Sequence, residues 1–275
     1  MRFLFIFLAA ACLFGETPDE MSWRVLDRGA HDGNPLKRKH AVLAMSLLRP
    51  EPRPVALLEG ALGDKDAGVR EAACSALGEI KSRNSIPKLQ MTLADAVPEV
   101  IFAAAKALYN MNDQTGRDVL MAVLLGEQAD ASGFLSGSIR SMKLKLHDPK
   151  ALILLGIQGG VGIAGPFGMG VPVAEGLLKD NQASGKTVAA LLLATDRSPE
   201  SLAAIKQELT DKNWTVRAAA AQAIGTRDAT GLYSNLTPLL DDKRDEVQYW
   251  AASAMIRLKQ PARAGAAGDK EKSAR

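Results

Sequence analysis

Aromatic residues are scarce in this chain of 275 residues, and cysteine and histidine are scarcer still. Phe, Trp and Tyr make up 5% of the sequence although 47% of it is hydrophobic, so alanine, leucine and valine supply most of the apolar surface. Such residues suit closely packed helices better than a β-sandwich. The length and the apolar content allow a substantial core and exclude a disordered or collagen-like chain.

The net charge is also small once it is divided along the chain. The formal net charge of the chain is +3, of which Arg2 contributes one unit and the tail from Lys259 to Arg275 contributes three. The residues between them therefore have a net charge near −1. A nucleic-acid-binding surface needs clustered Lys and Arg to displace counterions from phosphates. The sequence therefore predicts no nucleic-acid partner. The tail 259–275 lacks apolar periodicity and is predicted to be disordered.

Two cysteines and three histidines leave little material for metal or nucleophile chemistry. Cys12 lies in an N-terminal segment that we expect to be an export signal, so Cys74 would be alone and form no intrachain disulfide. We interpret Cys74 as a packed thiol. His31, His40 and His147 are far apart and lack the spacing of metal ligands. The sequence predicts no metal, no cofactor and no catalytic residue.

Residues 1–15 have the pattern of a secretory signal peptide, with Arg2, an apolar run and then small residues. As a helix the apolar run would span only about 20 Å of a roughly 30 Å hydrocarbon core, too little for a transmembrane helix. Three alanines before Cys12 also resemble a bacterial lipoprotein signal, which would comprise residues 1–11 and make Cys12 the lipidated first residue. Both alternatives predict an exported protein in the periplasm or cell envelope of a bacterium.

The rest of the chain repeats a short pattern. Val69 begins the string Val-Arg-Glu-Ala-Ala, and related strings begin at Val100, Val188, Val216 and Val247. Val69 and Val100 are 31 residues apart, as are Val216 and Val247, and a period of this length is typical of solenoids. Small or apolar residues fall at i, i+3, i+4, i+7 and i+8 of the two best strings. This spacing predicts an amphipathic helix that buries an alanine-rich stripe.

Polar turns precede these helices and prolines mark a partner helix in each unit. The turns at 64–66, 211–213 and 241–242 contain Asp or Asn side chains that can cap free amides. Proline fits the first turn of a helix, where its missing amide is not needed. The prolines concerned are Pro87, Pro199 and Pro238. Asp66 lies four residues before Arg70, and this spacing predicts an ion pair between them. The unit is therefore a helical hairpin, and seven or eight hairpins fit the body.

The strings 69–78 and 216–225 resemble the second helix of short bacterial HEAT repeats, Val-Arg-x-Ala-Ala-x-x-Ala-Leu-Gly, a repeat type that phycobilisome lyases share. The resemblance implies an all-α fold, a right-handed α-solenoid of HEAT-like hairpins with an armadillo-type superhelix. Such solenoids usually hold a partner on their concave surface. The resemblance divides the chain into N-terminal repeats at 16–126, a degenerate glycine-rich middle at 127–184 and C-terminal repeats at 185–258.

An aromatic set is the first candidate for partner contact. Phe102, Tyr109 and Tyr249 fall on the side of their helices opposite the buried stripe. If the second helices line the concave face, as in the family, these rings and Lys106 point into the groove and can anchor a partner. The alternative is that helices from the irregular middle of the chain cover the rings as part of the core.

The glycine-rich segment 156–170 is the second candidate, because it interrupts an otherwise helical pattern. It is either a buried irregular connection or a loop that presents Ile163, Phe167 and Met169 to a partner or a membrane.

Together these features predict an exported, non-enzymatic scaffold or adaptor that binds a protein or peptide partner on its concave surface. Two alternatives stay open. One is an enzyme or enzyme accessory, by analogy with the deoxyhypusine hydroxylase and bilin lyase members of the HEAT family. The other is a lipid-anchored adaptor at a membrane surface, which depends on lipidation of Cys12.

Overall fold

A computed structural model describes residues 16–125 and 181–260, and every regular element in these ranges is a helix. The first range contains α1 (Pro18–Ala30), α2 (Pro35–Ala44), α3 (Pro52–Ala61), α4 (Ala67–Glu79), α5 (Ile86–Thr92), α6 (Pro98–Asn110) and α7 (Gln114–Leu125). The second contains α11 (Asn181–Leu193), α12 (Pro199–Gln207), α13 (Trp214–Thr226), α14 (Tyr233–Leu236) and α15 (Asp245–Lys259). Short 3₁₀ turns are η1 (Met45–Leu47), η2 (Arg83–Ser85), η3 (Glu208–Thr210), η4 (Thr230–Leu232) and η5 (Thr237–Asp241). The predicted all-α fold is confirmed for the described residues.

Several predictions concern residues outside these ranges. They include the signal segment with Cys12, the glycine-rich segment with Ile163, Phe167 and Met169, and all but the first two residues of the tail.

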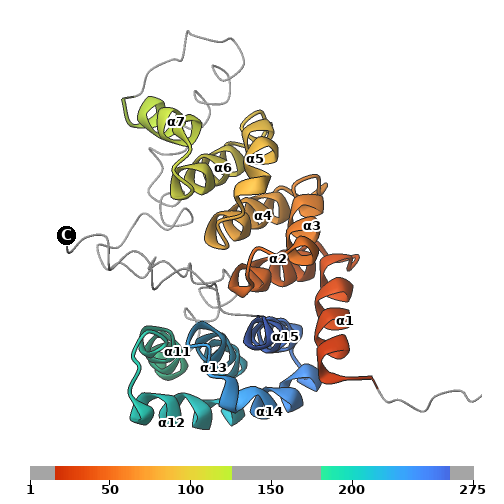
Figure 1. The fold of residues 1–275 in the computed structure, drawn as a ribbon, viewed down its shortest axis with the longest axis vertical. Helices are drawn as coiled ribbons and strands as arrows, with labels where there is room; N and C mark the ends of the chain where they lie inside the picture. The colour runs from red at the N-terminus through yellow and green to blue at the C-terminus, as the bar shows by residue number, and fades with distance from the viewer. Residues whose placement is uncertain (1–15, 126–180, 261–275) are drawn as a thin grey trace, which may run out of the picture.

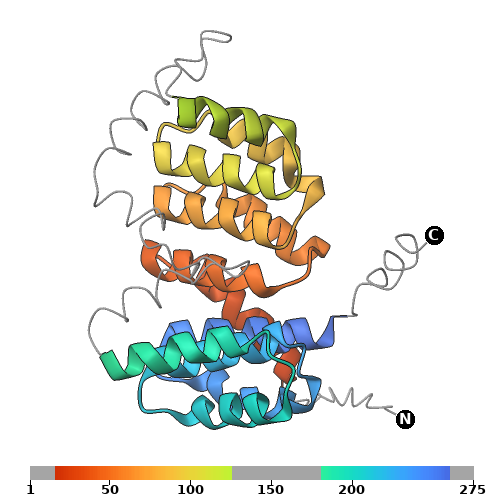
Figure 2. The same cartoon turned by 90° about the vertical axis from the view of Figure 1, so that its left-hand side faces the viewer.

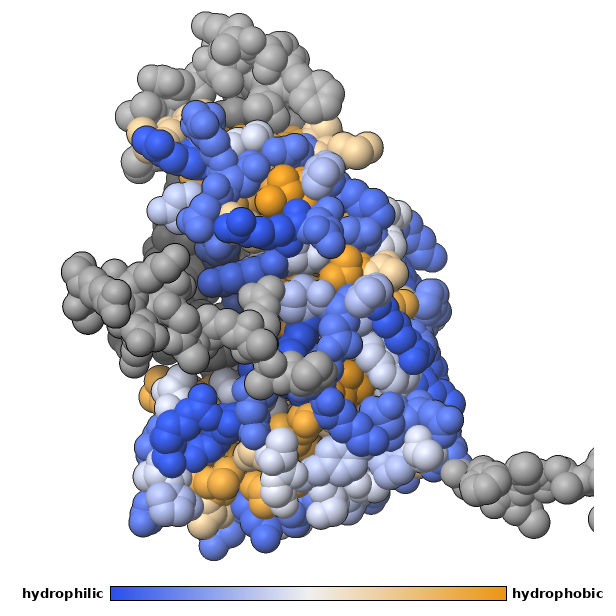
Figure 3. Space-filling view, viewed as in Figure 1, coloured by the Kyte–Doolittle hydropathy of each residue, from blue (hydrophilic) through white to orange (hydrophobic). Residues whose placement is uncertain are grey.

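The helices form an α-solenoid of stacked hairpins, as predicted, with an inner and an outer row (Figure 1). The inner row runs α11, α13, α15, α2, α4, α6, and each member packs against the next. The outer row consists of α12, α14, α1, α3 and α5, and α7 packs on α6 at the end of the stack. The inner row bends where α15 meets α2, so it lines a concave side. On the face seen in Figure 3, hydrophobic residues form small separate patches among hydrophilic ones.

Helix α4 illustrates why these residues form an inner helix. The Asp66 side chain accepts a hydrogen bond from the Val69 amide at 3.1 Å and so caps the free end of the helix, as the sequence predicted. The predicted apolar stripe is buried, with no member more than 2% exposed: Val69, Ala72, Ala73, Ala76 and Leu77. A Cβ atom at Gly78 would lie 2.9 Å from the backbone of Ala107 on α6. Small residues therefore let consecutive inner helices approach closely.

The partner helices follow the predicted prolines with one difference. Pro87 and Pro199 lie in the first turns of α5 and α12. Pro238 instead lies in η5, because the outer segment of that hairpin consists of the single-turn helix α14 followed by a 3₁₀ turn.

The register predicted for α11 is wrong. The helix begins at Asn181, before the predicted boundary at 185, and Val188 is only partly buried, whereas Thr187 and Ala190 are buried. The Lys186 ammonium lies 2.8 Å from Asp211, 25 residues later along the chain. Arg70 and Arg217 each form an ion pair with an aspartate at the same separation, so Lys186 occupies the equivalent position in its repeat.

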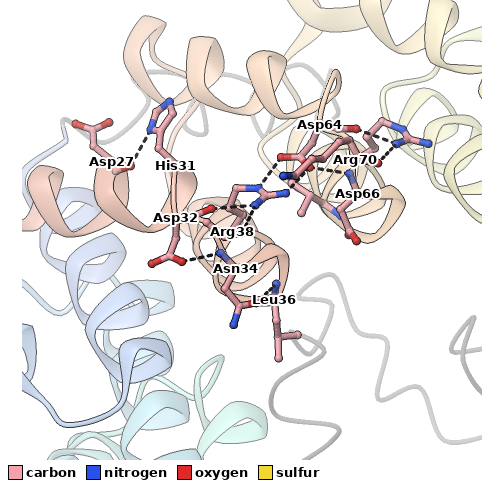
Figure 4. Close-up of polar contacts among 12 residues, drawn as sticks. Asp27, His31, Asp32, Asn34, Leu36, Arg38, Asp64, Asp66 and Arg70 are labelled. Atoms are coloured by element: carbon pink, nitrogen blue, oxygen red, sulfur yellow. Dashed lines mark hydrogen bonds and ion pairs between the residues drawn. The ribbon is translucent and has the colours of Figure 1, made fainter.

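A ladder of bidentate ion pairs joins successive hairpins at the starts of the inner helices. Figure 4 shows the first of them, between Arg38 and Asp64. In each rung an arginine donates from Nε and Nη2 to both carboxylate oxygens of an aspartate in the next repeat, over 2.7–2.9 Å. The rungs are Arg38–Asp64, Arg70–Asp95 and Arg217–Asp242. The third nitrogen, Nη1, donates to a backbone carbonyl of the preceding turn. This fork geometry fixes the spacing of neighbouring hairpins.

The ladder corrects the prediction that Arg70 pairs with Asp66. Asp66 uses its side chain to cap α4, while the arginine extends across the repeat boundary to Asp95. Burial alone would raise the pKa of the Asp95 carboxyl, but hydrogen bonds from Arg70 and from the Val97 amide outweigh burial and hold the pKa below its ordinary value. The pair that forms is the one that satisfies both oxygens of a largely buried carboxylate.

The last C-terminal hairpin stacks directly against the first N-terminal hairpin. Helix α15 packs against α1 and α2, although more than 200 residues separate them in the chain. Lys37 lies 2.8 Å from Asp245, and Arg28 donates to the Gln248 side chain at 2.7 Å. The two described ends of the chain therefore lie in the middle of the stack, and α7 and α11 lie at opposite ends of it (Figures 1 and 2).

We expect Arg70→Met to lower the free energy of unfolding by about 2–3 kcal/mol at neutral pH, because Asp95 would remain desolvated without its partner. A carboxyl whose pKa is lowered by folding stabilises the folded state fully at pH values above its ordinary pKa of 3.8. This stabilisation is lost as the pH falls through the lower pKa of the folded state. The difference between variant and wild type in urea unfolding should therefore shrink below about pH 4.

The matched control is Lys65→Met, which removes an exposed cation that makes no ion pair within the described residues. Equal destabilisation by both substitutions at neutral pH would contradict the role given to the ladder.

Candidate functional site

Three of the predicted contact residues share one face of α6. Phe102, Lys106 and Tyr109 follow one another at spacings of four and three residues, which places them along the solvent-facing line of an inner helix. The Tyr109 ring is 53% exposed and Lys106 is exposed, whereas Phe102 is half-buried against the core. We call this line the α6 face.

Charged residues on the neighbouring inner helices flank the α6 face, and the sequence analysis missed them. Glu71 and Glu79 lie along α4, and neither carboxylate makes an ion pair within the described residues. Burial raises the pKa of both carboxyls, although Lys39 acts in the opposite direction on Glu71 and Lys106 does so on Glu79. The concave side of α2, α4 and α6 therefore combines exposed rings with half-buried carboxylates.

The period of the repeat was the signal that could have found these residues. Glu71 and Phe102 are 31 residues apart and therefore occupy the same position in their repeats. In the repeat of Glu71 this position directly follows the ladder arginine Arg70. Lys39 occupies the same position after Arg38. In the consecutive helices α2, α4 and α6 none of the residues at this position is fully buried, so Phe102 predicts its charged neighbours.

The prediction for Tyr249 is wrong. This residue has the same repeat position as Phe102, but it is 2% exposed and belongs to the core. A Cβ atom at Gly29 would lie 2.5 Å from the Tyr249 ring and 2.7 Å from Ala41, so α1 and α2 enclose the ring. Burial raises the pKa of the Tyr249 hydroxyl. Tyr249 is therefore a core residue, as in the alternative, but the helices that cover its ring here are α1 and α2, and almost all of the irregular middle lies outside the described residues.

The residues considered for metal and thiol chemistry have structural surroundings. Cys74 is fully buried, as predicted, and burial raises the pKa of its thiol to about 12. His31 lies at the end of α1 with Nδ1 2.8 Å from the Asp27 carbonyl, and buried His40 lies 3.6 Å from Glu246. Among residues 16–125 and 181–260, no group of three or more His, Cys, Asp and Glu side chains could hold a metal ion.

A comparison with protein-family models identifies the type of repeat. The family model for HEAT repeats matches residues 24–109, 56–132 and 171–256, which together make up more than half of the chain. No curated protein sequence matches the chain. In the ranges that the structure describes, no helix has the length and apolar character needed to cross a membrane.

Solved structures of similar shape include human deoxyhypusine hydroxylase in complex with glycerol, at 17% identity and a TM-score of 0.34, covering 88% of this chain and 96% of that one. Another is the complex of CpcE and CpcF of phycocyanin lyase from Nostoc sp. PCC7120, at 16% identity and a TM-score of 0.34, covering 94% of this chain and 100% of that one.

Substitution of Tyr109 and of Tyr249 should change the free energy of unfolding by different amounts, because one ring is exposed and the other is buried. Tyr249→Ser removes a buried ring and should lower the free energy of unfolding by about 3–5 kcal/mol. Tyr109→Ser removes an exposed ring and should change it by less than about 0.5 kcal/mol. Chemical denaturation of both variants checks the assignment, and a large loss for Tyr109→Ser would place that ring in a packed environment instead.

Proposed function

Because this chain belongs to the HEAT-repeat family, we propose that it is a non-enzymatic scaffold or adaptor that binds a protein or peptide partner on its concave surface. The exposed ring of Tyr109, aligned with Lys106 and Phe102 on the α6 face, carries the proposal. The fold does not require this ring for packing, and exposed aromatic rings are common anchors of binding sites.

The charged residues beside the α6 face support the same function. Glu71 and Glu79 are partly removed from water and make no ion pair within the described residues. The charges of Lys39, acting on Glu71, and of Lys106, acting on Glu79, only partly offset the rise that burial causes in the pKa of each carboxyl. A carboxylate in this condition gains free energy when a binding partner supplies a lysine or arginine. A peptide that presents an apolar residue to the rings and a basic residue to α4 would satisfy both features.

We also propose that the protein is exported, on the signal-like pattern of residues 1–15. Cleavage in this pattern gives a free scaffold in the periplasm, whereas lipidation of Cys12 gives an adaptor held at a membrane surface.

The mass of the mature protein, purified from its own cells, tests the proposed export. We expect a chain that lacks at least residues 1–11, and an added diacylglyceryl group on Cys12 would identify the lipid-anchored form. An intact chain that starts at Met1 would contradict both forms.

A photo-crosslinking residue in place of Tyr109 should trap the partner in intact cells as a discrete adduct, because this side chain projects from the α6 face. A second site at Lys106 should give the same adduct. The adduct is detected by a shift on denaturing gels and identified by mass spectrometry.

Lys88 on outer helix α5 and buried Tyr249 serve as negative controls for crosslinking. The proposal fails if folded protein gives no adduct from positions 106 and 109, or if position 88 gives the same adduct as they do.

A further inference from the structure

The edge of the solenoid contains a cavity whose lining includes none of the three residues of the α6 face. Its volume is about 560 Å³, within the range of small-ligand sites. Three segments of successive repeats line it: residues 50–52 with Val55 at the start of α3, residues 81–84 after α4, and residues 110–112 at the end of α6 and in the turn that follows. We call this cavity the edge trough.

The edge trough has two cationic residues that make no ion pair in the described part of the chain, although the charge of Lys81 partly offsets the rise that burial causes in the pKa of Glu79 on α4. Lys81 and Arg83 are exposed and make no ion pair there, and neither does Glu51, the one acidic residue of the lining. The lining therefore has an excess of positive charge. The buried Met111 side chain, 4% exposed, adds an apolar surface between the polar groups.

The C-terminal half of the solenoid has a residue at the position equivalent to Lys81, and that residue forms ion pairs within the chain. Lys81, Asn112 and Asp228 each lie two residues after the end of an inner helix, and each has a left-handed backbone with φ between 52° and 60°. Asp228 is bound by two arginines of the chain itself, Arg49 and Arg257, each at 3.0 Å. At Lys81 the sign of the charge is reversed, and no carboxylate of the described residues pairs with it.

We propose that the edge trough binds an acidic, extended peptide segment of a partner protein. Lys81 and Arg83 would pair with its carboxylates, as Arg49 and Arg257 pair with Asp228. The carboxamides of Asn84, Asn110 and Asn112 line the trough, and each can donate to and accept from a peptide backbone. These amides in a recessed cavity favour a peptide over a flat anionic lipid surface.

The test uses the full-length protein and a fluorescein-labelled peptide of four Glu-Gly repeats, with Lys-Gly and Ser-Gly peptides as controls. Fluorescence anisotropy at low salt should show saturable binding of the acidic peptide alone, weakened by added salt. Lys81→Glu and Arg83→Glu should each weaken binding by about tenfold or more, because they replace attraction by repulsion. Glu51→Gln should strengthen binding, since it removes the one negative charge of the lining.

Lys65→Glu makes the same charge change on an exposed residue outside the trough and should leave the affinity within about twofold of wild type. Tyr109→Ser should also leave the affinity for the acidic peptide unchanged. Peptide binding at the edge trough can therefore be told apart from partner binding at the α6 face. Thermal unfolding of each variant checks that it is folded, and Arg83→Gln is a milder second variant.

Three results would overturn the proposal. The first is the absence of saturable binding at peptide concentrations up to about 1 mM. The second is equal weakening by Lys65→Glu and Lys81→Glu. The third is binding of phosphatidylglycerol vesicles through Lys81 and Arg83 without binding of the peptide, which would assign the trough to a lipid surface.

Discussion

The close approach of the inner helices is the constraint on which the rest of the structure depends. Alanine fills the facing stripes, and glycine stands where two helices are nearest: a Cβ atom at Gly78 would lie 2.9 Å from Ala107, and one at Gly225 would lie 3.0 Å from Ala254. Side chains this small bury little apolar area each, so the stack gains stability by adding repeats. On α4 and α6 the same stripe leaves one line of residues at the surface, whereas α13 and α15 are buried on nearly all sides.

The arginine–aspartate ladder gives this stack its register. An alanine stripe by itself allows helices to slide, because its surface is smooth and non-directional. A bidentate fork that also binds a backbone carbonyl tolerates little displacement, and its cost in desolvation is offset because both carboxylate oxygens are satisfied. The ladder therefore contributes spacing and orientation more than bulk stability. Lys186, which binds both Glu208 and Asp211, shows that the rung position persists where arginine is absent.

The junction between α15 and the first two helices explains why equivalent residues have different roles. Phe102 and Tyr249 occupy the same repeat position, but α15 also packs against α1, where Gly29 leaves room for the Tyr249 ring. On α6 the same position remains at the surface. A single repeat position thus serves packing at one level of the solenoid and solvent contact at another.

The sequence alone determined the hairpin repeat, the capped starts such as Asp66, the buried stripes and the packed state of Cys74, because each depends on residues close together in the chain or on periodicity. It also put Phe102, Lys106 and Tyr109 on one face, since helical geometry fixes spacings of four and three residues. Only the tertiary structure decided that Arg70 binds Asp95, that α15 packs on α1, that Tyr249 is buried and that three turns enclose the edge trough. These features join residues from different repeats, and periodicity within a sequence says which face of a helix is buried without saying which neighbour buries it.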